Sequence, residues 1–143
     1  MKKIIMFDID DTICRTFKAK YSEAIPIKKR IKIINKLYDE GYYIKIFTAR
    51  YMGRNNENSL LVKKKYYKKT YKQLVSWGLK FNELIMGKPT YDIYIDDKSY
   101  NSKEKKTFNK IYKLISKKLC LRKKLIIIIL NLKIKLENWI QIK

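Results

Sequence analysis

Short apolar runs alternate along the chain with longer stretches in which apolar residues recur every three or four positions. The runs cover residues 4–7, 44–47, 84–86 and 93–95, and each has the length of a buried strand. The stretches 27–38, 63–77 and 102–118 place apolar side chains on one face of a helix. This alternation predicts an α/β fold, a three-layer sandwich with a parallel, Rossmann-like sheet between helices.

Helix-end signals support these boundaries. Pro26 predicts the start of the first helix and Gly41 its end, and Gly78 predicts the end of the second. Asn101 and Glu104 stand at capping-box spacing before the third. No internal repeat or flexible linker divides residues 1–118, so they are predicted to form one domain.

The remaining residues, 119–143, form a basic and apolar tail whose pattern is ambiguous. Residues 132–136 alternate like a strand, whereas the apolar positions from Leu125 to Leu136 also fit one face of a helix. Three roles stay open for this tail: packing on the domain, binding an anionic membrane or a partner, and an aggregation-prone appendage.

A polar residue that can bind metal or phosphate follows each apolar run. In open α/β sheets, ligands bind outside the carboxyl ends of the strands, so these side chains are expected to converge. The residues are Asp8 and Asp10 after the first run, Thr48 after the second, Lys88 after the third, and Asp96 and Asp97 after the fourth. Each alone is more simply a turn or surface residue; their order and shared position predict one site.

The chemistry of such a site can be derived from its residue types. Four neighbouring carboxylates would repel one another unless a cation lay between them, and oxygen ligands without His or Cys favour Mg²⁺. A carboxylate that faces the substrate can act as a nucleophile. Lys and Thr side chains can hold and stabilise a phosphoryl group.

Composition excludes several other chemistries. The chain has no His, which removes Ser-His-Asp triads and His-ligated metals. Neither Cys14 nor Cys120 has an Arg six residues later, as a cysteine-dependent phosphatase would need, and no P-loop or dinucleotide fingerprint is present. The two thiols are expected to be reduced, in a cytoplasmic protein.

The formal net charge of +22 raises the question of a polyanionic partner. Only five of the 35 basic residues are Arg, whereas readers of nucleic-acid bases rely on Arg. A general bias toward Lys explains the charge better. Contact with nucleic acid or an anionic membrane is therefore open but not favoured.

Taken together, Asp8-Ile9-Asp10-Asp11-Thr12, Thr48, Lys88 and Asp96-Asp97 resemble the four motifs of the haloacid dehalogenase-like (HAD) phosphatase superfamily over about residues 1–101. The resemblance implies that Asp8 forms an aspartyl-phosphate and that Asp10 acts as acid and base. It implies Mg²⁺ ligands at Asp8, Asp10 and Asp96 or Asp97, and phosphate contacts at Thr48 and Lys88.

Residues 21–26, 48–50, 73–78 and 86–92 further resemble small HAD phosphatases found with capsule and surface-polysaccharide genes. This implies a phosphomonoester hydrolase acting on a sugar phosphate or polysaccharide precursor. A nucleotide or polynucleotide phosphatase of the same fold, and a non-catalytic anion-binding protein, are the alternatives.

No large cap domain is expected, because residues 13–25 and the segment between Thr48 and the third strand are too short to carry their own core. Water must then be excluded by the substrate, by a closing loop, or by a second subunit in a homo-oligomer. The basic residues of these segments are candidates for contacting the non-reacting part of a small phosphorylated substrate. They are Arg15 and Arg50 foremost, with Lys18, Lys20 and Arg54.

Overall fold

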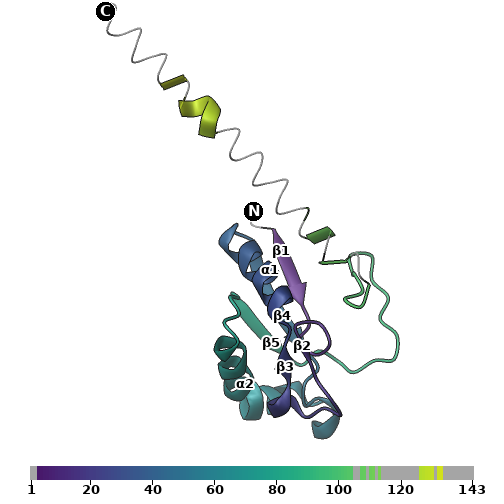
Figure 1. Ribbon diagram of the computed structural model, residues 1–143. Coiled ribbons are helices and arrows are strands. Elements are labelled where there is room, and N and C mark those ends of the chain that lie inside the picture. The colour runs from purple at the N-terminus through teal and green to yellow at the C-terminus, as the bar shows by residue number, and fades with distance from the viewer. Residues whose placement is uncertain are drawn as a thin grey trace, which may run out of the picture. The chain divides into compact units, whose positions relative to one another are not determined.

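A computed structural model of the chain describes residues 3–104, 107–108, 110–111, 113, 126–130 and 132–133. The chain divides into two compact units, Met1–Phe108 and Asn109–Lys143. The first unit contains every named helix and strand (Figure 1). The predicted boundary at residues 118 and 119 falls outside the described residues.

The first unit is built on a parallel sheet of three strands. The strands are β1 (Ile4–Phe7), β4 (Tyr43–Thr48) and β5 (Glu83–Met86), in the order β1-β4-β5. Helix α1 (Lys28–Asp39) connects β1 to β4 and packs on β4, and helix α2 (Ser59–Ser76) connects β4 to β5 and packs on β5. The α/β class and the parallel sheet are confirmed.

Only one face of this sheet is deeply buried. Alternate residues of β4 and β5 are buried, and the register places Ile46 beside Leu84 and Thr48 beside Met86 on that face. On the other face Lys45 pairs with Glu83 at 3.1 Å, and Met6 is 52% exposed. The predicted third layer is therefore not found among the named elements of this unit.

A small hairpin lies beyond the carboxyl end of β1, as Figure 1 shows. Its strands, β2 (Cys14–Arg15) and β3 (Ile25–Pro26), pair antiparallel, and a 3₁₀ turn, η1 (Tyr21–Glu23), lies between them. Pro26 thus ends a strand, and α1 begins two residues later, after Ile27 as its N-cap. A second 3₁₀ turn, η2 (Gly53–Asn55), precedes α2.

Two glycines end helices as predicted. Gly41 and Gly78 follow α1 and α2 with φ of 85° and 71°, a conformation that costs Gly little. Helix α2 begins four residues earlier than predicted because Asn58 caps it, with its side chain accepting a hydrogen bond from Leu61 N at 3.0 Å.

The predicted fourth strand, residues 93–95, is not a strand in the structure. Ile93 and Ile95 are 80% and 92% exposed, and β1 keeps an unpaired edge within the described sheet. A three-residue apolar run has too little local preference to form a strand without a partner. The prediction was wrong because it rested on the apolar run alone.

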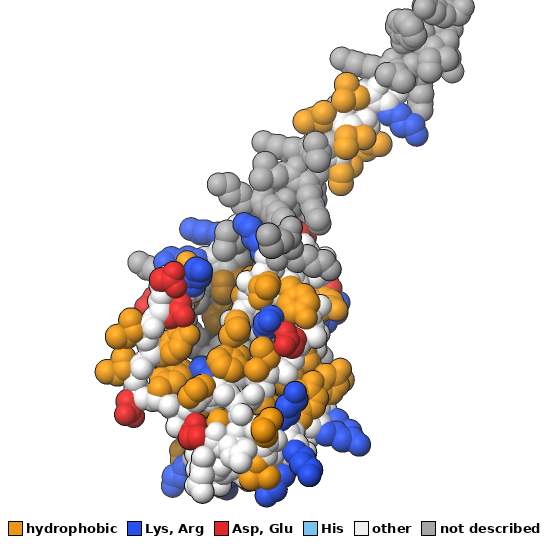
Figure 2. Space-filling view, turned by 180° about the vertical axis from the view of Figure 1, so that it is seen from behind, with side chains coloured by type: hydrophobic (Ala, Val, Ile, Leu, Met, Phe, Trp, Pro, Cys, Tyr) orange, Lys and Arg blue, Asp and Glu red, His pale blue; other side chains and the backbone are white. Residues whose placement is uncertain are grey.

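Hydrophobic side chains remain exposed in several patches on the side of the molecule shown in Figure 2. The described tail residues, 126–130 and 132–133, are helical and exposed, which favours the helical alternative for that part of the tail. Among the described residues, none of the helices combines the length and the apolar character needed to cross a membrane.

Candidate active site

The loop after β1 is a tight turn organised around one carbonyl. Ile9 O accepts hydrogen bonds from the amides of Thr12, Ile13 and Cys14 at 3.2, 2.7 and 3.2 Å. The turn passes through Asp11, whose φ of 55° is a left-handed conformation that Asp tolerates better than most residues. Ile9 itself is fully buried, so the turn fixes Asp8 and Asp10 on either side of a core residue.

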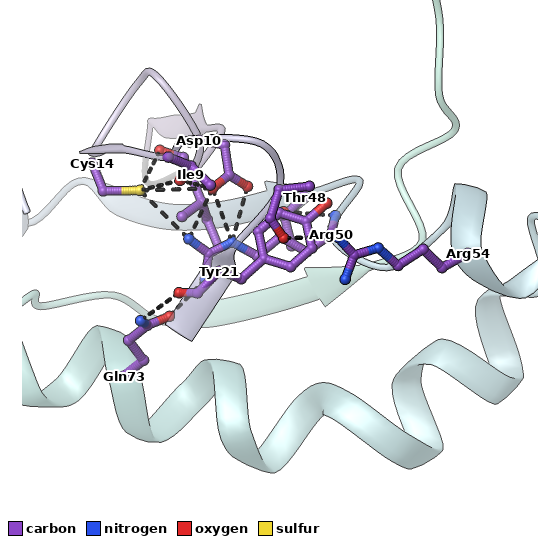
Figure 3. Close-up of polar contacts among 10 residues, drawn as sticks. Ile9, Asp10, Cys14, Tyr21, Thr48, Arg50, Arg54 and Gln73 are labelled. Atoms are coloured by element: carbon purple, nitrogen blue, oxygen red, sulfur yellow. Dashed lines mark hydrogen bonds and ion pairs between the residues drawn. The ribbon is translucent and has the colours of Figure 1, made fainter. Parts of the chain in front are cut away.

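Asp10 is held by a buried arginine. Arg50 donates from Nε to Asp10 Oδ2 and from Nη2 to Asp10 Oδ1, both at 2.9 Å, which is a bidentate ion pair (Figure 3). The Arg50 side chain is 1% exposed, and that of Asp10 is 26% exposed. Thr16 also donates a hydrogen bond to Asp10 Oδ1. This carboxylate is therefore fixed in position while one side stays open to solvent.

Arg50 is braced by further contacts. Its Nη1 donates to Gln73 Oε1 at 2.7 Å, and Gln73 Nε2 donates to Tyr21 O at 2.7 Å. Burial lowers the pKa of Arg50, but its hydrogen bonds with Asp10 and the charge of Asp10 outweigh this and raise that pKa above its ordinary value. The guanidinium thus stays charged inside the protein.

Arg50 therefore does not fit the role of a substrate contact that the sequence suggested. A side chain that is 1% exposed and already bonded to Asp10 and Gln73 cannot reach a ligand outside the fold. Arg15, in contrast, is exposed, at the edge of a cavity of about 720 Å³ that Thr16 and Phe17 also line. Arg15 remains a candidate.

Asp8 and Lys88 meet at the carboxyl ends of β1 and β5. Lys88 Nζ lies 3.6 Å from Asp8 Oδ1, and their side chains are 13% and 31% exposed. Burial raises the pKa of Asp8, the charge of Lys88 opposes this, and the charge of Asp10 adds to it. Burial lowers the pKa of Lys88, but a hydrogen bond with Tyr91 and the charge of Asp8 raise it overall.

Gly87 explains how Lys88 reaches this place. Its φ is 101°, and a Cβ at this position would lie 2.7 Å from Ser59 Cβ at the start of α2. The chain can turn here only with Gly. Lys88 N then donates to Thr48 O at 3.1 Å, which extends the pairing of β4 and β5 by one step.

Thr48, the last residue of β4, is fully buried. Its Oγ1 accepts a hydrogen bond from Arg50 N at 3.1 Å, and its own O–H has no acceptor among the described residues. The hydroxyl therefore shapes the turn that carries Arg50. Because Thr48 is fully buried, its hydroxyl does not reach a ligand outside the fold, so this geometry does not supply the phosphate contact predicted at Thr48.

Asp96 and Asp97 are not brought to this site. Both are exposed, and Asp96 is satisfied locally, by Lys98 N at 2.6 Å and by the Tyr94 hydroxyl at 2.9 Å. The Lys98 amide and the Tyr94 hydroxyl hold the pKa of Asp96 below its ordinary value. In the described part of the chain no three acidic or Cys side chains lie together as a metal site would require. The four-carboxylate Mg²⁺ site is thus not assembled.

Sequence reasoning missed three members of this network: Cys14, Thr16 and Gln73. Cys14 is fully buried and lies 3.4 Å from Arg50 Nη2. The sequence did offer one signal for the network as a whole, namely Arg50. An Arg in a Lys-rich chain marks a place where the planar, forked guanidinium is needed. Nothing local to Thr16 or Gln73 indicates that they contact the loop after β1.

Comparison with known proteins yields one informative likeness. No protein-family model matches the chain, and no curated protein matches it significantly. A crystal structure from Vibrio cholerae, described only as an MCSG target, is 23% identical with a TM-score of 0.66, over 81% of this chain and 98% of that one. At this identity the likeness shows that the two chains share a fold.

Proposed function

We propose that the chain is a HAD-like phosphomonoester hydrolase that acts through an aspartyl-phosphate on Asp8. One observation carries the proposal: Asp8 lies 3.6 Å from a mostly buried Lys88, and the fixed carboxylate of Asp10 stands two residues away in the same turn. A nucleophile, a cation for the phosphoryl oxygens and an acid/base group then lie at the same edge of the sheet, after β1 and β5.

In the first step an Asp8 carboxylate oxygen attacks phosphorus, and the bond from phosphorus to the leaving oxygen breaks. Asp10, entering this step protonated, gives its proton to the leaving alcohol. Lys88 balances the negative charge of the phosphoryl oxygens. The products are an alcohol and an aspartyl-phosphate.

In the second step Asp10, now a carboxylate, takes a proton from water while the water oxygen attacks phosphorus. The bond between phosphorus and the Asp8 oxygen breaks, which releases phosphate and restores Asp8. The bidentate ion pair with Arg50 holds the Asp10 carboxyl group in place for this step. Arg50 thus serves as a positioning residue in this proposal.

The predicted Mg²⁺ requirement does not fit the described geometry, because within the described residues Asp8, Asp10, Asp96 and Asp97 form no cluster of three potential metal ligands. Metal dependence would need residues 93–97 to move to the free edge of β1, where Ile4 and Met6 are 61% and 52% exposed. Mg²⁺ stays a prediction with a specific structural condition attached.

A sugar phosphate or polysaccharide precursor is the proposed substrate. The support is chemical: a cap domain is lacking within residues 3–104. The exposed cavity beside Arg15 has mixed polar and apolar walls; Asp8, Asp10 and Lys88 do not line it, but Thr16, which bonds Asp10, does. An enzyme without a cap leaves room for the large leaving group of such a precursor.

The test is release of inorganic phosphate from sugar phosphates, nucleotides and polynucleotide 3′-phosphates, with and without Mg²⁺. Protein digested after rapid acid quenching should carry a phosphoryl group on the peptide that contains Asp8. An active wild-type enzyme whose Asp8→Asn variant kept its turnover would overturn the proposal.

A further inference from the structure

A second, smaller cavity lies on another side of the hairpin, and the proposed chemistry does not use it. Its volume is about 230 Å³, and three segments far apart in the sequence form it. Residues 19–22 supply one wall, Tyr51 and Arg54 a second, and Lys69 of α2 a third. Since pockets for drug-sized ligands measure about 300–1,000 Å³, this cavity suits a small ligand.

Every charged residue that lines the cavity is a cation: Lys20, Arg54 and Lys69. Lys20 pairs with Glu23, whose carboxylate lies 3.3 Å from Lys20 Nζ. This pair is exposed, and Glu23 does not line the cavity. Exposed pairs of this kind contribute little. Cations that face a shared cavity repel one another, and an anion between them would relieve this cost.

The walls are held in a defined shape. Tyr51 stacks on Tyr66 with ring centroids 3.9 Å apart, and Tyr21 meets Tyr51 edge-on at 4.7 Å. Arg54 Nη2 donates to Ala19 O at 3.0 Å, which ties the second wall to the first. Side chains prearranged in this way lose little entropy when a ligand binds.

Two of the lining residues also have unusual backbone conformations. Ala19 and Tyr51 have φ of 51° and 66°, a left-handed region that residues other than Gly rarely adopt. Strain of this kind is concentrated at ligand sites more than elsewhere. Here two strained residues from distant segments line the same small cavity.

One wall of this cavity also borders the catalytic network. The Tyr21 ring lies between two guanidinium groups, with Arg50 Cζ at 5.0 Å and Arg54 Cζ at 5.6 Å from its centroid (Figure 3). Tyr21 O also accepts from the Gln73 amide that braces Arg50. A group bound against Tyr21 and Arg54 would stabilise the same bracing that positions Asp10.

We propose that this cavity binds a small oxyanion, a phosphate group, between Arg54, Lys69 and Lys20. The group is either free inorganic phosphate or a non-reacting phosphate of an organic ligand. Charge-assisted hydrogen bonds from Lys and Arg to phosphate supply the affinity, and the Tyr21 and Tyr51 rings form an apolar wall. The site is separate from the Asp8–Lys88 pair.

The test measures phosphate binding by calorimetry at fixed ionic strength, in the full chain carrying Asp8→Asn and Lys88→Ala. These changes disable the proposed catalytic phosphate site, so the result does not depend on whether the protein is an enzyme. Adding Lys69→Ala should weaken binding about tenfold, as expected for loss of one charge-assisted contact. Lys68→Ala, the matched control, should change it less than twofold.

Lys68 and Lys69 are both exposed on α2 and carry the same charge, but only Lys69 lines the cavity. Equal weakening by the two variants would overturn the proposal, because it would show attraction by net charge alone. Absence of phosphate binding in the Asp8→Asn, Lys88→Ala protein would also overturn it.

A second arm identifies the source of the phosphate group. If an organic ligand supplies it, a sugar bisphosphate should bind wild-type protein more tightly than inorganic phosphate, and Lys69→Ala should remove that advantage. If free phosphate is the ligand, both should bind alike and lose about tenfold with Lys69→Ala. Amide NMR shifts of Ala19 and Ser22 on titration would place either ligand in the cavity.

Discussion

Two acid-bearing segments look alike in sequence, yet differ in the structure: residues 8–16, which follow the first apolar run, and residues 91–97, which contain the fourth. In the first, Ile9 is fully buried and the Asp10 carboxylate is bonded to Arg50, which lies 40 residues later in the sequence, just after β4. In the second, Ile93 and Ile95 are 80% and 92% exposed. An apolar run followed by acids is thus not enough to place a segment on a sheet.

The difference lies in where the hydrogen-bond partners come from. Arg30 donates to Asp11 O and Thr12 O at 2.9 and 2.8 Å, so two arginines from distant positions hold the first segment. Among the described contacts, Asp96 is bonded only to the nearby residues Tyr94, Lys98 and Ser99. Long-range bonds fix the first segment against the core, whereas the hydrogen bonds of Asp96 all lie within three residues and tie it to no other element.

The largest effect is expected at the nucleophile of the first segment. Asp8→Asn should lower phosphate release at least about a thousandfold, because an amide is a poor nucleophile. Asp11→Asn, a matched change three residues along in an exposed left-handed position, should leave activity within about twofold, since Asn also tolerates that conformation. Turnover assays on both variants decide whether the first segment carries the chemistry.

The next largest effect should be the slow alkylation of the buried Cys14 thiol in the native protein. Burial is the main cause that raises the pKa of Cys14, to about 11. Relative to an ordinary thiol this leaves roughly a hundredfold less thiolate at pH 8. Alkylation of Cys14 in a Cys120→Ser background should be at least that much slower in native protein than in urea. Similar rates would show that the first segment opens readily.

Loss of the bidentate ion pair between Arg50 and Asp10 should lower the free energy of unfolding markedly. Arg50→Lys keeps the charge but cannot bond Asp10 bidentately and Gln73 at once, so the free energy of unfolding should fall by about 2 kcal/mol, discounted for the partial exposure of Asp10. Arg15→Lys, at an exposed arginine, should change it by less than about 0.5 kcal/mol. Urea titrations of the two variants measure this. Equal losses of unfolding free energy would show that the Arg50–Asp10 pair does not stabilise the fold.

A smaller change should appear when Mg²⁺ is added. Amides of residues 91–97 should exchange with solvent fast in the metal-free protein and about tenfold more slowly with Mg²⁺, if the segment pairs with β1 to complete the site. Amides of Ile13 and Cys14, already bonded to Ile9 O, should not change. Unchanged exchange at 91–97 would remove the metal from the proposal.

The smallest effect concerns stability in the second segment. Asp96→Ala should alter the free energy of unfolding by less than about 0.5 kcal/mol, because Asp96 is exposed and bonded only locally. The same variant should still weaken any Mg²⁺ protection of residues 91–97. A large loss of stability would show that this segment is packed in solution.

The two long helices and the strands of the parallel sheet were predictable from sequence, whereas the strands of the hairpin and the fate of the run 93–95 were not. Helices α1 and α2 and strands β1, β4 and β5 were expected within a few residues, because their apolar patterns coincide with end signals such as Gly41 and Gly78. The two-residue strands β2 and β3 carry too few residues for a pattern to decide them. The runs 84–86 and 93–95 are equally short, but only the first pairs with a neighbouring strand, as part of β5 beside β4.

The sequence by itself determined the α/β class, and it placed Asp8 and Lys88 after strands whose carboxyl ends a parallel sheet brings to the same edge. Only the tertiary structure decided the role of Arg50, which changed from an exposed candidate to the buried partner of Asp10. It also decided that Asp96 and Asp97 do not join Asp8 and Asp10 in a metal-binding cluster within the described residues. Periodicity reports which face of an element is buried, whereas contacts between distant polar side chains depend on how those elements pack.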